Sequence, residues 1–424
     1  MRPASGWGML GVRRSDDPPP DPPESHMDAD IERVEPVPGE PALIRRDQLL
    51  TDAPGMAAVA RWTAAVTEAD GVFRIRLVPG VDVCDLAATV RDRGHAASPN
   101  HILVGQPLFF GGPASRPFPA PPPPPPGAAP GGGPDGPGGP GNVRGDGGDG
   151  DREGGGAPRD IPGGSDRPSG PGGPGGPGAP VTVAVADTGL AAHPWWRDLP
   201  WFLERRREAA EVPDADGDGR LDPQAGHGTF VTGLILRSAP EARVRPLRVL
   251  DGRGVGDEAG LLRALTRLRD EPPQVLNLSL GGHTYDDRPS PLLEAALAGL
   301  PGTVAVACAG NTASDRPFWP AALPGVIAVG ALDAAGRDRA PFSAHGPWVD
   351  ACAPGEWLTS SFLEHGAFHG YARWSGTSFA AAVVSGAIAA ATQGRTPAEA
   401  AAHVLDPERN RKISDLGVVV AGPR

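Results

Sequence analysis

The main feature of the chain is a repeating pattern of apolar and amphipathic runs after residue 180. Five short runs are apolar and mostly β-branched, which is typical of buried strands, and most of the runs between them have the spacing of helices. Apolar strands that alternate with helices predict a parallel sheet covered on both faces. The fold class is therefore α/β, with strands expected at 181–186, 244–250, 274–280, 303–308 and 326–331 and helices at 227–237, 258–269 and 290–299.

A shorter pattern upstream predicts a second, smaller module. It places a small α/β unit within residues 41–111, whereas residues 1–40 have no periodic pattern and are expected to be disordered. Its expected elements are a helix at 55–67, a strand at 72–78, an amphipathic helix at 82–93 and a strand at 100–104.

Glycine and proline dominate the segment between these two patterns. The chain holds 61 Gly and 53 Pro among 424 residues, and residues 112–179 are rich in both, with a proline run from Pro121 to Pro126. Such a segment buries too little apolar surface to offset the entropy of ordering it. Residues 112–179 are therefore expected to be a linker, which leaves 180–424 as the main domain.

The charge and the N-terminus exclude several partners and locations. With a net charge of −12 and a pI near 5.3, the chain has no general attraction for nucleic acid. No apolar run reaches the length of a membrane span, and residues 1–25 lack the apolar core of a secretory signal. We expect a cytoplasmic, bacterial protein that starts at Met1 or at Met27.

The candidate chemistry centres on Ser378, at the start of an Ala-rich helical pattern. Gly376, just before it, allows a tight turn and the close approach of a ligand. A serine hydroxyl is a weak nucleophile by itself. A catalytic role therefore needs a histidine base, a carboxylate that orients the histidine, and donors for an oxyanion.

Three residues upstream match those needs. Asp187 ends the first strand, His227 starts a helix between two glycines, and Asn311 follows the strand at 303–308. Each is ordinary by itself: Asp187 and Asn311 suit turns or caps, and His227 suits a cap or a solvated surface. Together with Ser378, however, all of them fall at strand ends or helix starts, where open α/β sheets bind ligands. We therefore expect them to form one site.

With these residues the chain resembles the subtilisin-like serine peptidases, the subtilases of peptidase family S8. The chain order Asp, His, Ser is that of subtilisin. The resemblance covers about residues 181–404 and implies the three-layer, subtilisin-like α/β fold with a mostly parallel sheet. The matching motifs are Asp187-Thr188-Gly189, His227-Gly228-Thr229, Asn277-Leu278-Ser279-Leu280-Gly281-Gly282, Ala309-Gly310-Asn311 and Gly376-Thr377-Ser378.

The resemblance implies a serine endopeptidase that works through an acyl-enzyme intermediate and needs no cofactor for its chemistry. Ser378 would attack the scissile carbonyl, His227 would take its proton, and Asp187 would orient the imidazole. Asn311 and the backbone N–H of Ser378 would form the oxyanion hole. A peptide or protein substrate would pair through its main chain with two segments, Gly254-Val255-Gly256 and Ser279-Leu280-Gly281.

Several positions depart from the family pattern. Phe230, Phe379 and Ala382 stand where the family commonly has His, Met and Pro, and Trp374 replaces a smaller residue. These are packing positions around the nucleophile helix. Every chemical group is retained, while the substrate preference and the fine geometry are left open.

An acidic loop at 214–222 spaces its carboxylates as a calcium loop does. Asp214, Asp216, Asp218 and Asp222 offer oxygen ligands that suit a hard cation, but Ala225 stands where a glutamate is expected at the twelfth position. The alternatives are a structural calcium site and a solvated acidic surface loop.

The upstream module resembles the inhibitory propeptide of the family, with a strand, a helix and a strand that ends in Pro99-Asn100-His101-Ile102. That resemblance implies intramolecular inhibition by residues 41–111. An unrelated adaptor domain is the alternative, because such short α/β patterns are generic.

Two other functions compete with the endopeptidase. A catalytically inactive peptide-binding scaffold of the same fold would keep the groove, although retention of all four catalytic groups speaks against it. An α/β-hydrolase would have a Gly-x-Ser-x-Gly motif, which does not occur around Ser378, and a different triad order. A fluorophosphonate probe, which reacts with active-site serines, distinguishes the enzyme from the scaffold.

Overall fold

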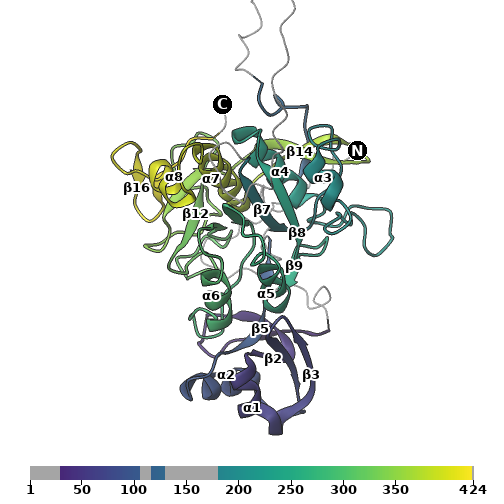
Figure 1. Cartoon of the computed structure of the whole chain (residues 1–424), viewed down its shortest axis with the longest axis vertical. Coiled ribbons are helices and arrows are strands. Elements are labelled where there is room, and N and C mark those ends of the chain that lie inside the picture. The colour runs from purple at the N-terminus through teal and green to yellow at the C-terminus, as the bar shows by residue number, and fades with distance from the viewer. Residues whose placement is uncertain (1–28, 106–115, 129–179, 423–424) are drawn as a thin grey trace, which may run out of the picture.

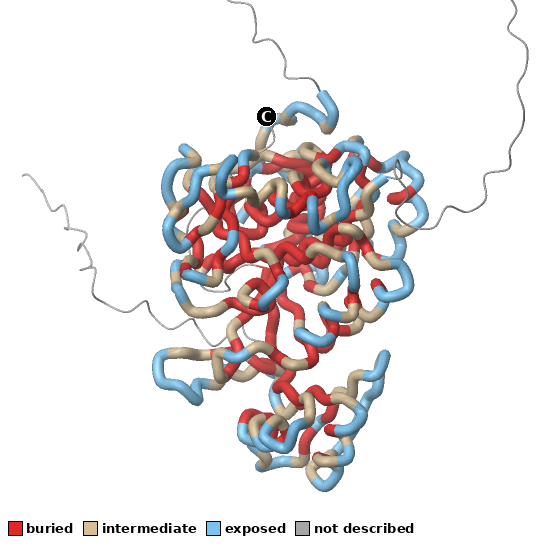
Figure 2. Tube along the Cα trace, turned by 60° about the vertical axis from the view of Figure 1, so that its left-hand side comes forward, coloured by how far each residue is buried: buried red, intermediate tan, exposed pale blue. Residues whose placement is uncertain are grey.

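The computed structural model describes residues 29–105, 116–128 and 180–422. Figure 1 shows a small module, formed by the residues up to 105, below a larger domain formed by the residues after 180. Buried residues fill the interior of the larger domain and form a smaller group in the module (Figure 2).

The larger domain is built on an eight-stranded sheet that is parallel except at one edge. The strand order is β16-β17-β13-β12-β11-β10-β7-β8, and only β16 and β17 pair antiparallel. The predicted α/β fold with a mostly parallel sheet is confirmed. The strands are β7 Thr182–Asp187, β8 Arg243–Arg248, β10 Val275–Leu278, β11 Val304–Cys308, β12 Val326–Leu332, β13 Ala351–Pro354, β16 Lys412–Ile413 and β17 Gly417–Val419.

Helices cover both faces of this sheet and give three layers. On β7, Val183 and Val185 point into a core with α4 and α7, whereas Ala184 and Ala186 point into a core with α5 and α6. This is the alternation that a strand imposes on its side chains. The covering helices are α4 His227–Ser238, α5 Glu258–Thr266, α6 Pro291–Ala298 and α7 Thr377–Ala391, with α3 Pro200–Arg205 beside β8 and α8 Pro397–Val404 beside α7.

The helices begin in two different ways. The side chains of Asp257 and Ser290 cap α5 and α6, because each accepts a hydrogen bond from a backbone N–H of the first turn. In contrast, α4 and α7 follow Gly226 and Gly376 and have no side-chain cap. Side chains from other elements accept hydrogen bonds from first-turn N–H groups instead, Thr188 at α4 and Asn311 at α7, and the candidate base and nucleophile lie at these starts.

The module is an antiparallel sheet with two short helices. Its strand order is β3-β4-β2-β5-β9, and β1 pairs with β2. The last strand, β9, comes from the larger domain, so the sheet continues from one body into the other. The elements are β1 Ile31–Val34, β2 Ala42–Thr51, α1 Ala53–Val59, the 3-10 helix η2 Ala60–Trp62, β3 Thr63–Ala69, β4 Val72–Leu77, α2 Val83–Asp92, β5 Ala97–Val104 and β9 Val255–Asp257.

Two expectations for the N-terminal part are wrong. Residues 1–40 are not disordered throughout, because Ile31–Val34 pair with β2; residues 1–28 lie outside the described residues. The helix expected at 55–67 ends at Val59, and Thr63–Ala69 form a strand. Pairing with β4 overrides the helical spacing there, since the β-branched residues of this segment suit a strand.

The linker prediction is also wrong in part. Phe118–Pro119 form β6, which pairs with the hairpin of β14 (Leu358–His365) and β15 (Phe368–Trp374). The rings of Phe118 and Trp357 lie 5.7 Å apart, centroid to centroid. Pairing at an open strand edge supplies backbone hydrogen bonds that composition does not reveal. The rest of the predicted linker, residues 112–115 and 129–179, lies outside the described residues, as do residues 106–111 of the predicted module.

Within residues 29–105, 116–128 and 180–422, no helix is both long and apolar enough to cross a bilayer. The expected cytoplasmic location stays a prediction.

Candidate active site

Asp187 and His227 form a buried hydrogen-bonded pair. Asp187 is the last residue of β7 and His227 the first of α4, and His227 Nδ1 lies 2.7 Å from Asp187 Oδ1. A carboxylate only accepts, so Nδ1 carries the hydrogen, and in a neutral imidazole Nε2 is then the nitrogen with the lone pair. A Cβ on Gly228 would lie 2.2 Å from the carbonyl oxygen of Gly189. Only glycine therefore lets α4 start this close to the end of β7.

Ser378 lies at the start of α7 and is fully buried. Its Oγ donates a hydrogen bond to the carbonyl oxygen of Gly105, at 3.2 Å, and lies 3.4 Å from the carbonyl oxygen of Ser279. His227 Nε2 is buried and has no hydrogen-bond partner among the described residues. The hydroxyl is thus turned toward Gly105, the last described residue of the module segment.

Large aromatic side chains surround the imidazole. The rings of Trp374 and Phe379 lie 5.5 and 5.2 Å from the ring of His227, centroid to centroid, and Phe230 packs on Phe379 at 4.5 Å. Three of the positions that depart from the family pattern therefore form one cluster behind the histidine. With this cluster packed on it, the imidazole is fully buried.

Asn311 is held by the residue that precedes the candidate nucleophile. Its Oδ1 accepts hydrogen bonds from the backbone N–H of Thr377, at 2.8 Å, and from Thr377 Oγ1, at 2.9 Å. With Oδ1 used in this way, the Nδ2 group is the donor that the side chain has left to offer. Asn311 lines a cavity of about 20 Å³ together with Gly105, Gly310 and Phe318. Asn311 and Gly105 therefore line one small cavity next to the candidate nucleophile.

Residues 102–104 lie between the two segments predicted to bind substrate. They pair antiparallel with β9, with Leu103 opposite Gly256. On the other side, the N–H of Val104 donates to the carbonyl oxygen of Gly281 at 2.8 Å, and the N–H of Gly281 donates back at 3.0 Å. The N–H of Gly105 donates to the carbonyl oxygen of Gly254, also at 3.0 Å.

The remaining predicted substrate-binding residues lie in the same two segments. Val255 is the partner of Val104 in the β5–β9 pairing. The side chain of Leu280 is buried in the core beneath α5 and α6, so this residue offers only its backbone to the groove. Ser279 Oγ donates to the carbonyl oxygen of Ser378 at 3.1 Å and ties the segment to α7.

Glu211 is a neighbour of the Asp187–His227 pair that sequence reasoning missed. Thr188 Oγ1 donates to Glu211 Oε2 at 3.0 Å, and Glu211 Oε1 is buried without a partner among the described residues. Burial raises the pKa of Glu211 to about 7, and the charge of Asp187 adds to the effect against the opposing hydrogen bond from Thr188. No motif marks this glutamate, because the chain only brings it beside Asp187 in the fold.

Cys308, at the end of β11, is a second neighbour without a role in the predicted chemistry. It lines the same small cavity as Asn311. Burial raises the pKa of its thiol to about 12, so it is a neutral thiol near neutral pH.

The acidic loop brings together part of the predicted calcium set. Carboxylate oxygens of Asp214, Asp216 and Asp218 lie within 4.8 Å of one another. Asp222 is not part of this group, and its Oδ2 accepts a hydrogen bond from the N–H of Ala215 at 3.1 Å. Backbone N–H groups of the loop donate to Asp214 and lower its pKa. Three converging carboxylates fit a hard cation, and calcium binding stays a prediction.

Comparison with known proteins decides the family. The model of the subtilase family of peptidases matches residues 178–413, which is more than half of the chain. The chain belongs to the subtilase family. The curated relatives of this subtilase include thermitase of Thermoactinomyces vulgaris, 33% identical over 221 residues that cover 49% of this chain and 76% of thermitase.

Two further similarities involve other members of the family. A thermophilic serine proteinase of Bacillus sp. (strain AK1) is 37% identical over 239 residues, which are 48% of this chain and 57% of that protein. The chain thus spans little more than half of that relative. A crystal structure of a cold adapted subtilisin-like serine proteinase has 27% sequence identity and a TM-score of 0.45, covering 57% of this chain and 88% of the other.

Proposed function

We propose that this subtilase is a serine endopeptidase in which Asp187, His227 and Ser378 form the catalytic triad. The buried hydrogen bond between Asp187 and His227 carries the proposal, since it leaves Nε2 as the basic nitrogen. In the reaction, Ser378 Oγ loses its proton to Nε2 while it forms a bond to the scissile carbonyl carbon. The imidazolium next protonates the leaving amine, and water then hydrolyses the acyl-enzyme through the same base.

Asn311 and the backbone N–H of Ser378 are proposed as the oxyanion hole. Thr377 fixes Asn311 through its Oδ1, so the amide is positioned before any charge develops. A donor that is already in place costs no reorganisation when the carbonyl oxygen becomes negative. Segments 254–256 and 279–281 would hold an extended peptide or protein substrate by main-chain pairing, as they hold residues 102–105 here.

Variants of the triad test this proposal. Ser378→Ala and His227→Ala should each abolish hydrolysis of fluorescein-labelled casein, while the melting temperature shows that the fold is kept. Because an aromatic cluster packs on His227, its variant needs this folding control most. Undiminished hydrolysis by Ser378→Ala would refute the assignment.

We also propose that the module, residues 41–111, inhibits the enzyme within the same chain. The support is that residues 102–104 pair with both sides of the groove and that the Gly105 carbonyl lies against Ser378 Oγ. A peptide held there excludes any other substrate. Inhibition therefore depends on the backbone pairing of this segment.

Val104→Pro, made in the full chain, tests the inhibition. Proline has no N–H to donate to the Gly281 carbonyl, so pairing should weaken and hydrolysis of a short fluorogenic peptide should rise severalfold. Val66→Ala is the matched control, because Val66 belongs to the same module but is 49% exposed. If both variants hydrolyse the peptide at the wild-type rate, residues 41–111 are not an inhibitor, and the alternative of an unrelated adaptor domain is favoured.

A further inference from the structure

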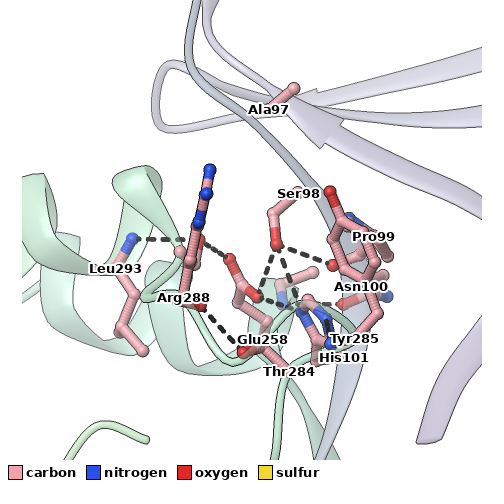
Figure 3. Close-up of polar contacts among 12 residues, drawn as sticks. Ala97, Ser98, Pro99, Asn100, His101, Glu258, Thr284, Tyr285, Arg288 and Leu293 are labelled. Carbon is pink, nitrogen blue, oxygen red and sulfur yellow. Dashed lines mark hydrogen bonds and ion pairs between the residues drawn. The ribbon is translucent and has the colours of Figure 1, made fainter. Parts of the chain in front are cut away.

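A buried polar cluster lies where the module meets the larger domain, beyond the groove. Figure 3 shows Ser98 and His101, from β5, pointing toward Glu258 at the start of α5. His101 Nδ1 lies 3.1 Å from Glu258 Oε2, and Ser98 Oγ lies 3.1 Å from the same oxygen. Ser290 Oγ donates to Glu258 Oε1. All four side chains are at most 2% exposed.

The contacts around His101 show which kind of side chain fits into this cluster. Glu258 as a carboxylate only accepts, so Nδ1 donates to it. The N–H of Tyr285 donates to Nε2 at 3.4 Å, which requires a lone pair on that nitrogen. The rings of His101 and Tyr285 are stacked, with an interplanar angle of 12° and centroids 6.0 Å apart. A neutral imidazole, with one donor, one acceptor and a flat face, fits all three contacts.

The larger domain supplies most of this site. Glu258, Tyr285 and Ser290 belong to it, and Ser290, the N-cap of α6, already holds one oxygen of Glu258. A peptide that covers Glu258 as β5 does buries its carboxylate, which is costly unless the peptide also supplies a donor. His101 precedes Ile102, which pairs with Asp257 in β9. The site therefore lies on the path of any peptide that enters the groove as β5 does.

We propose that Glu258, with Tyr285 and Ser290, is a recognition site for a histidine side chain three residues before the peptide residue that pairs with Gly281. This rests on the proposed function and adds a substrate class to it: peptides, including the protein's own module, with histidine at that position. Alanine offers no donor to Glu258. Lysine offers a donor but has no acceptor for the N–H of Tyr285 and no ring to stack on it.

Competition by two short peptides tests the site. The first has the sequence of residues 98–105, and the second is identical except for alanine at the histidine. The enzyme is the full chain with His101→Ala and Val104→Pro, so that its own module neither presents the histidine nor keeps its backbone pairing with the groove. Labelling of Ser378 by a fluorophosphonate is followed over time, and each peptide should slow it by occupying the groove.

We expect the histidine peptide to halve the labelling rate at a concentration at least about tenfold lower than the alanine peptide, the size of one hydrogen bond to a buried charge. Glu258→Ala, added to the same chain, removes the acceptor and should bring the two concentrations within about twofold. Asp286→Asn is the matched control. Asp286 lies beside Tyr285 but pairs with Arg91, so the tenfold preference should persist in that variant.

The outcomes separate the two proposals. Absence of labelling without any peptide contradicts the serine peptidase itself. Labelling that both peptides slow equally, or that neither slows, contradicts the histidine site, as does a preference that survives Glu258→Ala. A second readout needs no peptide: His101→Ala alone should label faster than the wild-type chain, because the module has lost its buried contact.

Discussion

Replacing Glu211 by glutamine should make the protein more stable than the wild type at and above neutral pH. The carboxyl group is buried beside Asp187, with one oxygen held by Thr188 and the other without a partner among the described residues. Glutamine keeps an acceptor for Thr188 but cannot ionise. The substitution therefore removes a buried charge and little else.

The size of this stability difference follows from the pKa of Glu211 in the unfolded chain and its pKa in the folded protein. The pKa of Glu211 is raised from 4.5 to about 7 by burial. When folding raises the pKa of an acid, its contribution to the free energy of unfolding is fully present at pH values below its pKa in the unfolded chain. That contribution is lost as the pH rises through its pKa in the folded protein. Two and a half pH units at about 1.4 kcal/mol each correspond to about 3 kcal/mol. The wild type should thus lose about 3 kcal/mol relative to Glu211→Gln between pH 4.5 and pH 7.5.

Urea unfolding followed by tryptophan fluorescence measures this difference at several pH values. Both proteins should also have Ser378→Ala to prevent self-digestion. Glu204→Gln replaces an exposed glutamate of α3, and its stability should follow that of the wild type at every pH. If the curve of Glu211→Gln also stays parallel to that of the wild type from pH 4.5 to 8, the carboxyl group is not a buried acid and the reasoning fails.

Two other predictions concern the oxyanion hole and the acidic loop. Asn311→Ala should lower kcat by about 10²- to 10³-fold with little change in KM, which is the size found for the side-chain donor in subtilisin. Steady-state kinetics on a peptide substrate measures both constants. An unchanged kcat would exclude Asn311 from the oxyanion hole. If the acidic loop binds calcium, a chelator should lower the melting temperature, and Asp216→Asn should remove that sensitivity. If the chelator does not change the melting temperature, the loop is a solvated acidic surface loop and not a calcium site.

The sequence was sufficient to predict the fold of the larger domain because the patterns that mark its strands and helix starts are local. Apolar strands and the glycines beside Asp187, His227 and Ser378 mark where strands end and helices begin, and the structure has the three residues at those places. Their catalytic roles stay predictions. The motif order also indicated the family, which the match over residues 178–413 confirms.

Sequence was insufficient where long-range contacts decide the structure. The strand β6 depends on an edge that lies some 250 residues away along the chain. Glu211 acquires its raised pKa only when it is buried beside Asp187. The same holds for His101 and Glu258, which are 157 residues apart and meet only when the module docks. No local pattern encodes such pairs.

The central claim, that Ser378 is a nucleophile activated by His227, is tested most directly by locating a fluorophosphonate adduct. The intact chain with Val104→Pro, in which the module no longer pairs fully with the groove, should gain one adduct by mass spectrometry, and peptide mapping should place it on Ser378. His227→Ala should slow its formation by orders of magnitude, because no base then removes the hydroxyl proton. An adduct on another residue, or an equal rate in His227→Ala, would contradict the account.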